Sequence, residues 1–308
     1  MERKSITMVD ITHKKNSLRI ATAQAIVKVG TQLTIDAINN NDVPKGNVFE
    51  MSKAAGLLGV KKTPELLPDC HPLPIEYTGF DFEINGLEIQ IKCTIKTIYK
   101  TGVEVEAMHG ASIVALNMYD MLKPIDKDIS IEQIKLLAKT GGKSDLPIVQ
   151  SHINAAVIVC SDSISIGQGE DKAGVALCNQ LEALGMSINT YEVIPDDLEG
   201  IQIKAKKLVA EQIQFIIFCG GTGVSPRDNT PEALLPLLDK RLIGVEEAMR
   251  SYGQQRTLMA MFSRSVAGII DESLILALPG STKGATESLE AIMPTLLHLF
   301  DVLNGKKH

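Results

Sequence analysis

Residues 215–228, with the sequence FIIFCGGTGVSPRD, decide the fold of the C-terminal half of the chain. The apolar run Phe215–Cys219 is typical of a strand that is buried on both faces of a sheet. The glycines that follow, at 220, 221 and 223, allow backbone N–H groups to approach a phosphate, and Thr222 adds a hydroxyl group. Many strand-to-helix turns contain glycines and bind nothing, but the position between a buried strand and a helix that begins at Pro231 favours a ligand site.

The segments on both sides of this stretch alternate between strand and helix patterns. The further strands expected are 155–160, 188–194 and 274–278, and the helices are 172–185, 198–212, 231–239 and 283–303. This order predicts a doubly wound, mostly parallel α/β sandwich. A Rossmann-type dehydrogenase is excluded because no GxGxxG segment opens the first strand–helix unit.

Three aspartates follow predicted strands or the glycine segment, namely Asp162, Asp196 and Asp228. In a doubly wound sheet, ligands bind at the carboxyl ends of the strands, so these side chains are candidates for a common site. The alternative is a local role, because Asp228 can cap the next helix and Asp196 lies in a turn by composition. Carboxylates beside a phosphate loop are typical of a Mg²⁺ site, so Asp196 and Asp228 are the candidate metal ligands.

The composition limits the possible functions. The chain has 308 residues, enough for about two domains of roughly 150 residues. Aromatic residues make up 4% and Trp is absent, which argues against base stacking and hence against single-stranded nucleic acid as a partner. A net charge of −6 means that an anionic substrate must be held by a local basic cluster. The five cysteines form no CxxC pair, which argues against a zinc site and for a reducing compartment.

A soluble, cytoplasmic protein without a membrane partner is expected, since no long apolar run and no signal peptide are evident. The segment GGKSDLP at 141–147 is the best linker candidate. We therefore expect domains at 1–144 and 153–308, joined by a linker at 145–152. In the first domain the pattern predicts helices at 17–40, 48–59, 104–122 and 130–139. A hairpin is expected within 75–97, turning at Asn85-Gly86.

Several polar residues of the first domain are candidates for a site. Glu104 and Glu106 alternate and would share one face of an extended stretch, where like charges raise a pKa. Asp120 and Lys123 are three residues apart on a predicted helix and are therefore neighbours. Lys45 lies in a turn by composition. Each has an ordinary alternative: a polar outer face, a surface ion pair or a solvated loop.

The first half resembles the MoaC family of cyclic pyranopterin monophosphate synthases, over about residues 5–144. The matching segments are MVDIT (8–12), KG (45–46), TPELLPDCHPL (63–73), KTGVEVEA (100–107), YDM (119–121) and LAKTGGK (137–143). The resemblance implies a ferredoxin-like α+β fold that assembles as a hexamer with sites shared between subunits. It also implies conversion of 3′,8-cyclo-7,8-dihydro-GTP to cyclic pyranopterin monophosphate, with release of pyrophosphate.

By this resemblance Asp120 and Lys123 form the acid–base core, with Lys45 beside them. The implied substrate-binding residues of this half are Arg19, Lys61, His71, Glu104, Glu106 and Lys139. The sequence departs from the family at Met108-His109-Gly110, where Leu-Thr-Ala is expected. His109 is either harmless there or changes the protonation of the two glutamates. Asp145 also replaces a final Gly.

The second half resembles the MoaB and MogA molybdopterin-binding proteins. The matching segments are SDS (161–163), VIPDD (193–197), GGTGVSPRD (220–228), TPE (230–232), SRSVAG (263–268) and LPGS (278–281). The resemblance implies a trimeric α/β sandwich that binds molybdopterin and Mg-ATP and transfers AMP to the pterin's terminal phosphate. Asp196 and Asp228 match the family's functional aspartates, and the implied ligand-binding residues are Ser161, Asp162, Gly220, Gly221, Thr222, Gly223, Pro279, Gly280 and Ser281.

Two departures concern the catalytic role of this half. The segment DKAGV at 171–175 stands where Asp-x-Ser-Gly-Pro is expected, which changes positions 173 and 175 to Ala and Val. Thr282 stands where a Pro is expected.

The whole chain is interpreted from both resemblances as a bifunctional enzyme of molybdenum cofactor biosynthesis, a hexamer- or trimer-based homo-oligomer without a tightly bound cofactor. The alternative is that the second half is a non-catalytic pterin-binding and oligomerising module.

Overall fold

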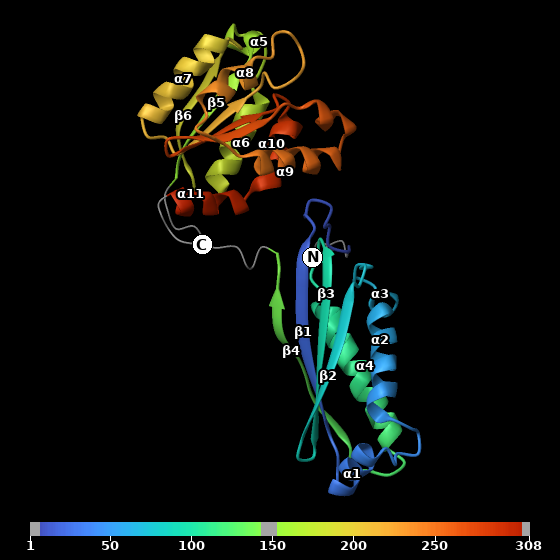
Figure 1. Ribbon diagram of the computed structural model, residues 1–308. Coiled ribbons are helices and arrows are strands. Elements are labelled where there is room, and N and C mark those ends of the chain that lie inside the picture. The colour runs from blue at the N-terminus through green and yellow to red at the C-terminus, as the bar shows by residue number, and fades with distance from the viewer. Residues whose placement is uncertain (1–6, 143–152, 304–308) are drawn as a thin grey trace, which may run out of the picture. The chain divides into compact units, whose positions relative to one another are not determined.

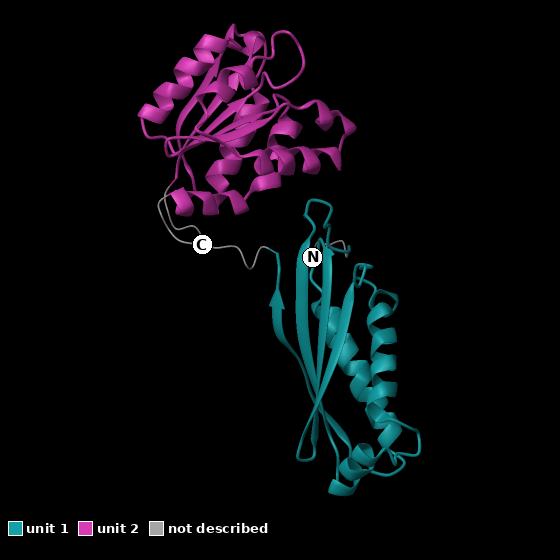
Figure 2. Ribbon diagram, viewed as in Figure 1, with its two compact units in different colours: residues 1–146 teal, residues 147–308 magenta. Residues whose placement is uncertain are grey.

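The computed structural model describes residues 7–142 and 153–303. The chain divides into two compact units, Met1–Leu146 and Pro147–His308 (Figure 2). Each unit contains its own sheet and its own hydrophobic core. The predicted linker at 145–152, with Asp145, lies outside the described residues. Among the residues described, no helix is both long enough and apolar enough to span a bilayer.

The N-terminal unit is a four-stranded sheet with helices α2 and α4 on one face (Figure 1). Its elements are β1 (Ser17–Lys28), α1 (Gln32–Asn40), α2 (Val48–Lys61), α3 (Thr63–Leu66), β2 (Tyr77–Asn85), β3 (Glu88–Tyr99), α4 (Glu104–Leu122) and β4 (Ser130–Thr140). The strand order is β2-β3-β1-β4, and all neighbouring strands are antiparallel. This order and pairing confirm the predicted ferredoxin-like α+β fold.

Three local predictions in this unit are wrong. Residues 17–28 form strand β1 rather than the start of a helix, and 130–140 form strand β4. In β1 every second residue from Ala21 to Val27 is buried, which is the period of a strand that faces the helices. Glu104 and Glu106 lie in the first turn of α4 and not on an extended stretch. The hairpin and the helices at 48–59 and 104–122 are confirmed.

Helix α4 packs very closely against its neighbours because small residues face them. A Cβ atom added to Gly110 would lie 2.6 Å from Val60 Cγ2 on α2 and 2.9 Å from Cys93 Sγ on β3. One added to Gly56 on α2 would lie 2.5 Å from Phe80 Cζ. Ala107, Ala111 and Ala115 of α4 are fully buried in the same core. The position of α4 relative to α2 and the sheet is therefore closely fixed.

The C-terminal unit is a six-stranded sheet covered by helices on both faces (Figure 1). Its first elements are β5 (Asn154–Cys160), α5 (Asp162–Ser165), α6 (Lys172–Ala183), β6 (Ser187–Ile194), α7 (Leu198–Ala210), β7 (Phe215–Cys219), α8 (Thr230–Leu234) and η2 (Leu235–Leu237). The later elements are β8 (Lys240–Arg241), α9 (Ile243–Gln254), η3 (Leu258–Phe262), β9 (Val266–Ile270), β10 (Ser273–Leu278), α10 (Thr282–Ile292), η4 (Thr295–Leu297) and α11 (His298–Leu303).

The strand order is β6-β5-β7-β10-β9-β8. Strands β6, β5, β7 and β10 are parallel, whereas β9 and β8 are antiparallel to their neighbours. Strand β7 is fully buried: Phe215 and Ile217 belong to the core on one face, and Ile216 and Phe218 to the core on the other. The predicted doubly wound, mostly parallel sandwich is confirmed. Strands β8 and β9 and helix α9 had not been predicted, and helix α10 ends before Pro294 rather than continuing to 303.

Candidate functional site

One cluster of the N-terminal unit consists of Lys45, Asp120 and Lys123. Asp120 lies in the last turn of α4, Lys123 follows that helix directly, and Lys45 precedes α2. Lys45 Nζ donates to Asp120 Oδ2 at 2.6 Å and to the Asp120 backbone oxygen at 2.8 Å. Lys123 Nζ lies 2.7 Å from Asp120 Oδ1. The structure thus brings together Asp120 and Lys123, which the resemblance implied as the acid–base core, and Lys45, which it implied beside them.

The charges of this cluster follow from its hydrogen bonds. Donation from Lys123, and then from Lys45, lowers the pKa of Asp120 to about 2. The same hydrogen bond raises the pKa of Lys123. At neutral pH the carboxylate is ionised and Lys123 is protonated. Asp120 is then a weak base that orients the lysines, while a protonated Lys123 can donate a proton or hold a phosphate.

A pocket lies near the opposite end of α4. Its lining includes Cys70, His71, Glu104 and Glu106. The side chain of Glu106 is 2% exposed, and the Cys70 thiol donates to its Oε1 at 3.1 Å. Burial raises the pKa of Glu106, and the nearby Glu104 adds to the shift. Burial also raises the pKa of Cys70 to about 12, so this thiol stays protonated and remains a donor.

Lys139 and Arg19 lie near this pocket. Lys139 Nζ on β4 lies 3.2 Å from Glu104 Oε1. Arg19 on β1 donates from Nε to the Tyr99 carbonyl oxygen at 3.3 Å, and Tyr99 precedes the pocket residue Thr101 by two positions. Lys61 is exposed at the end of α2.

Two histidines lie at the same end of the unit. His71 Nε2 lies 2.8 Å from the Val9 carbonyl oxygen. His109 Nδ1 lies 2.9 Å from Thr63 Oγ1, so its ring is tied to α3, and burial lowers its pKa. His109 is not among the groups that shift the pKa of Glu106.

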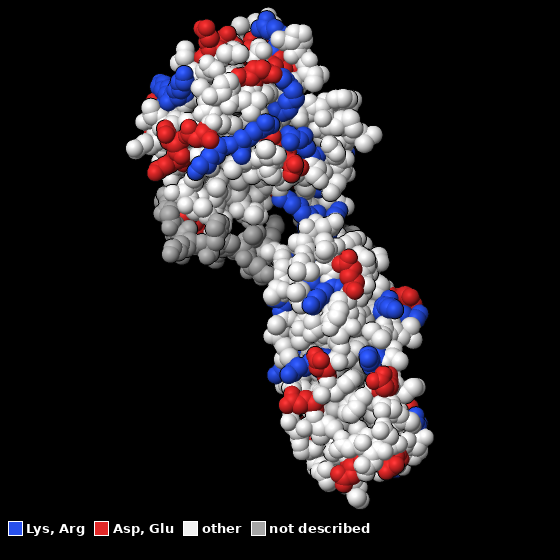
Figure 3. Space-filling view, in the orientation of Figure 1, with Lys and Arg blue, Asp and Glu red and all other residues white. Residues whose placement is uncertain are grey.

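The predicted residues of this unit therefore form two groups at opposite ends of one helix. Glu106 and Asp120 are fourteen positions apart in α4, which corresponds to about 21 Å along the helix axis. The visible face of the unit carries acidic and basic side chains in small mixed groups rather than one wide basic surface (Figure 3). No direct contact among the described residues of one copy joins the two groups.

In the C-terminal unit the predicted residues meet at the carboxyl ends of β5, β6 and β7. The backbone N–H of Asp196 donates to Asp162 Oδ1 at 3.1 Å, which joins the ends of β6 and β5. Asp228 Oδ2 accepts from the backbone N–H of Ser225 at 2.7 Å and so closes the loop that follows β7. Arg227 forms an ion pair with Asp162 across the same edge.

The glycine loop after β7 has a backbone that only glycine adopts easily. Gly220 has a φ of 113° and Gly221 a φ of 59°. A side chain at Gly221 would collide with Asp196 and with Thr230 Oγ1. Asp196 Oδ1 and Thr230 Oγ1 are buried and find no hydrogen-bond partner among the described residues. Both oxygens lie beside Gly221, and because the Asn229 N–H and the Thr230 hydroxyl only partly offset the burial of Asp196, the arrangement favours a bound group that supplies donors or a cation.

Asp196 is 9% exposed, and this burial raises its pKa to about 6, with Asp228 and Asp162 adding to the shift. Within residues 7–142 and 153–303, no group of three or more His, Cys, Asp or Glu side chains is placed to hold a metal ion. Asp196 and Asp228 would hold Mg²⁺ only if phosphate oxygens and water completed its shell, which is how Mg²⁺ usually binds with nucleotides. The oxygen donors present fit that ion.

Arg264 fixes the glycine loop from the other side, a role that sequence reasoning missed. Its Nε donates to the Gly223 carbonyl oxygen and its Nη2 to that of Asp228, both at 2.7 Å. Its backbone N–H donates to the Thr222 carbonyl oxygen at 2.9 Å, and its guanidinium pairs with Glu232. The only sequence signal was its place in the SRSVAG segment, which does not reveal backbone contacts.

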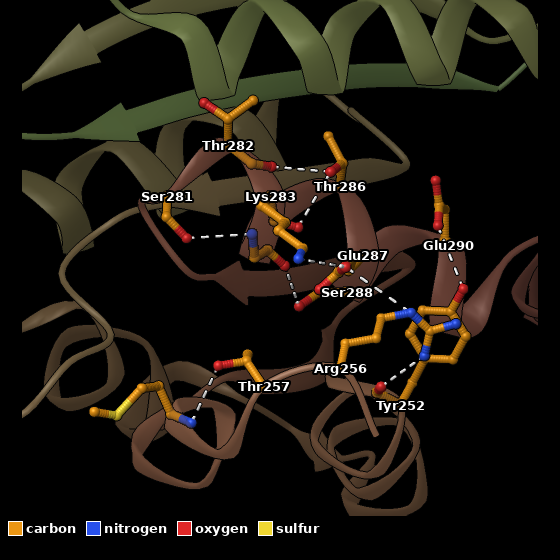
Figure 4. Close-up of polar contacts among 12 residues, drawn as sticks. Tyr252, Arg256, Thr257, Ser281, Thr282, Lys283, Thr286, Glu287, Ser288 and Glu290 are labelled. Atoms are coloured by element: carbon orange, nitrogen blue, oxygen red, sulfur yellow. Dashed lines mark hydrogen bonds and ion pairs between the residues drawn. The ribbon is translucent and has the colours of Figure 1, made fainter. Parts of the chain in front are cut away.

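A second pocket lies between α9, η3 and the start of α10, where Ser281 and Pro279 contribute to its lining. Ser281 caps α10 by accepting from the backbone N–H of Gly284 at 3.2 Å (Figure 4). Thr282, at the position where a Pro was expected, is the first residue of α10 and leaves the helix start intact.

The departures at 173 and 175 lie on α6. Ala173 is 5% exposed in the core, whereas Val175 is 47% exposed. Asp171 still caps this helix, accepting from the backbone N–H of Gly174 at 2.9 Å and from the Tyr191 hydroxyl at 2.6 Å.

Comparisons with known proteins agree with this division of the chain. Residues 8–142 match the model of the MoaC family, and residues 156–298 match that of a probable molybdopterin binding domain. A molybdenum cofactor biosynthesis bifunctional protein of Chlorobaculum tepidum is 37% identical over 307 residues, covering 100% of this chain and 97% of the relative. A probable cyclic pyranopterin monophosphate synthase of Archaeoglobus fulgidus is 44% identical over 151 residues, covering 46% of this chain and 96% of the relative.

The crystal structure of the molybdopterin biosynthesis enzyme MoaB from Thermus thermophilus is 40% identical, covering 50% of this chain and 98% of that chain, with a TM-score of 0.47. The two family models and the full-length relative identify both halves. The chain belongs to the family of bifunctional molybdenum cofactor biosynthesis proteins, with a MoaC half followed by a MoaB/MogA-type half.

Proposed function

We propose that the N-terminal unit converts 3′,8-cyclo-7,8-dihydro-GTP to cyclic pyranopterin monophosphate and releases pyrophosphate. The observation that carries this proposal is the Lys45–Asp120–Lys123 cluster, in which one carboxylate orients two cationic donors. Closing a cyclic phosphate and expelling pyrophosphate requires cations along the phosphates and protons delivered to leaving oxygens. Lys123 is the proton donor, Lys45 supports the developing charge, and Asp120 holds both in place.

The second group completes the site from another copy of the chain. Glu106, whose pKa is raised by burial, acts on the purine-derived part of the substrate together with Glu104 and His71. Arg19, Lys61 and Lys139 bind the phosphates. Because the two groups are about 21 Å apart on one helix, a compact substrate reaches both only where α4 ends of two copies meet. A homo-oligomer is therefore part of the proposed function.

Variants of the cluster test this half. Asp120→Asn and Lys123→Ala are expected to lower turnover by roughly 10²- to 10⁴-fold while thermal unfolding stays near wild type, because both side chains are half-exposed. Glu65→Gln, which removes a surface ion pair with Lys62, is the matched control and should keep full activity. Near wild-type turnover in either cluster variant would refute the assignment.

For the C-terminal unit we propose binding of molybdopterin and transfer of AMP from ATP to its terminal phosphate. The glycine loop, with its backbone N–H groups and Thr222, would hold a phosphate at the carboxyl end of β7. Ser161 and Asp162 line the neighbouring strand end, and Pro279 and Ser281 belong to the second pocket. When bound, Mg²⁺ would neutralise negative charge on the phosphates as pyrophosphate leaves. Asp196 and Asp228 would hold the ion beside them. The orphaned oxygens beside Gly221 support this proposal.

The alternative is a binding module without catalysis. The intact caps of α6 and α10 favour the enzyme, since positions 173, 175 and 282 change no helix start. Incubation of the full chain with molybdopterin and Mg-ATP, followed by detection of adenylylated molybdopterin, decides between the two. The enzyme predicts product from the wild type and none from Asp228→Asn, with pterin binding retained in both. If intact wild-type protein forms no adenylylated product, the C-terminal unit is a binding module without catalysis.

A further inference from the structure

Helix α4 is joined to the short helix α3 by a hydrogen bond between His109 and Thr63. His109 Nδ1 lies 2.9 Å from Oγ1 of Thr63, the first residue of α3. Thr63 is fully buried, and its hydroxyl group donates to backbone carbonyl oxygens at the end of α2, at 2.9 Å to Val60 and 3.4 Å to Gly59. A threonine hydroxyl has a single proton, so Oγ1 accepts the hydrogen bond from His109. His109 Nδ1 therefore carries a proton and is the donor.

The loop that follows α3 forms part of the wall of the N-terminal pocket. The pocket-lining residues of this loop are Leu67, Pro68, Asp69, Cys70, His71 and Leu73. Residues 65–69 are exposed, so burial contributes little to the position of the loop. The backbone N–H of Cys70 donates to the Leu67 carbonyl oxygen at 2.9 Å, and that of Leu67 donates to the Thr63 carbonyl oxygen at 3.0 Å. The start of the loop is thus connected through these turns to the buried Thr63.

A second contact joins the loop to the same face of α4. The Cys70 thiol donates to Glu106 Oε1 at 3.1 Å, and Glu106 precedes His109 by three positions. Residues three positions apart on a helix are neighbours on its surface. The two hydrogen bonds therefore hold both ends of the segment 63–70 against one face of α4. A thiol is a weak donor, so the contact from the imidazole of His109 is the stronger of the two.

We propose that His109 is a positioning residue for the reaction of the N-terminal unit: it holds α3 in place and thereby sets the positions of Cys70 and His71 in the pocket. The proposal rests on the proposed function of this unit. His109 is not among the residues that line the pocket, so its ring acts through the loop and not on the substrate. A displacement of about 1 Å in a group that positions a substrate can cost roughly 10²-fold in rate.

Three variants of the full chain test the proposal. His109→Phe keeps a flat ring but removes the donor, whereas His109→Asn keeps a donor because its side-chain amide nitrogen can take the place of Nδ1. Thr63→Val removes the same hydrogen bond from the acceptor side. His109→Phe and Thr63→Val should each lower kcat/KM for formation of cyclic pyranopterin monophosphate by roughly 10- to 100-fold, and the double variant should lose little more than either. His109→Asn should recover most of the activity.

The thiol of Cys70 reports the position of the loop independently of the reaction. Burial, and then the contact with Glu106, raises the pKa of Cys70 to about 12, so iodoacetamide should modify it slowly at pH 8 in the wild type. A displaced loop loses both influences, and its thiolate fraction rises about tenfold for each unit by which the pKa falls. Alkylation of Cys70, followed by peptide mass spectrometry, should be about tenfold faster in His109→Phe and near wild type in His109→Asn. Cys178, in the C-terminal unit, is the internal reference.

Glu65→Gln is the matched control on α3. It removes an exposed ion pair with Lys62 and should change neither kcat/KM nor the alkylation of Cys70. Thermal unfolding shows whether His109→Phe is folded, and Thr63→Val carries the test if it is not.

The outcomes separate this inference from the function on which it rests. Unchanged kcat/KM, or unchanged alkylation of Cys70, in a folded His109→Phe would overturn the inference. Activity that His109→Asn does not recover would also overturn it, because the imidazole would then act in a way that an amide donor cannot replace. If the wild type forms no cyclic pyranopterin monophosphate, the proposed function fails, whereas the alkylation of Cys70 still decides whether His109 places the loop.

Discussion

Two inactive variants of the N-terminal unit should restore activity to each other when their subunits mix. The variants are Asp120→Asn, at one end of α4, and Glu106→Gln, near the other. Each alone should lose roughly 10²- to 10⁴-fold in turnover, because each removes a group that moves or positions a proton. If a site takes its cluster from one copy and its pocket from another, a mixed pair has one site with both groups intact.

The recovery can be worked out from this geometry. With equal co-expression, one of the two sites in every mixed pair is intact, so pairs that carry both variants should have about one half of wild-type turnover. This is far above the background of either variant. The assay follows cyclic pyranopterin monophosphate formed by proteins that carry two different tags and are purified through both.

The control uses two changes at the same end of the helix. Asp120→Asn mixed with Lys45→Ala should recover nothing, because both residues belong to one cluster and every site then carries one of the two changes. The reasoning is refuted if doubly tagged oligomers of the first mixture stay at the background of the single variants. It is equally refuted if the control mixture recovers.

Three further predictions follow from the described contacts. Burial raises the pKa of Asp196 to about 6, above its value in the unfolded chain, so the ionised carboxylate opposes folding. Asp196→Asn removes this charge and should raise the free energy of unfolding at pH 8 by about 1–2 kcal/mol. Urea unfolding in the presence of a chelator should show this gain shrinking as the pH falls from 6 to 4, and a gain independent of pH would contradict it. Arg264→Ala removes two 2.7 Å hydrogen bonds to the glycine loop, so it should speed hydrogen exchange of amides 220–228 and weaken ATP binding about tenfold. Unchanged exchange would show that the loop keeps its conformation without Arg264. Lys45→Ala should weaken substrate binding by about tenfold at low salt and by less at high salt, measured by isothermal titration, and a loss independent of salt would argue against a phosphate contact.

The sequence predicted the C-terminal fold well because its strands are buried on both faces. Runs such as Phe215–Cys219 have no polar alternation that could be mistaken for a helix face, and the turns between elements carry the candidate aspartates. The convergence of Asp162, Asp196 and Asp228 followed from one rule about strand ends. The short antiparallel strands β8 and β9 escaped prediction because their pairing depends on a neighbour that the local pattern does not contain.

The N-terminal strands were harder for a different reason. β1 contains three alanines, which favour a helix in isolation, and becomes a strand because β3 and β4 pair with it on both sides. β4 is exposed along most of its length, so its sequence shows no buried face from which a period could be read. In both cases long-range pairing outweighs local propensity.

Some contacts of the candidate sites could also be predicted from the sequence, and others could not. Asp120 and Lys123 could be paired from their spacing on a helix, but the approach of Lys45 depends on how α2 enters the fold. The role of Arg264 depends on the positions of backbone carbonyl groups, which only coordinates reveal.

In the proposed shared site, helix α4 sets the distance between the two groups of residues. Its length sets the spacing between Glu106 and Asp120, and the tight packing at Gly110 prevents it from sliding along α2. Inserting one residue in its middle would lengthen it by about 1.5 Å and turn one end by about 100° relative to the other. The two groups would then point in directions that no partner copy could match. The central turns of α4 should accordingly accept some changes of residue type but no change of length.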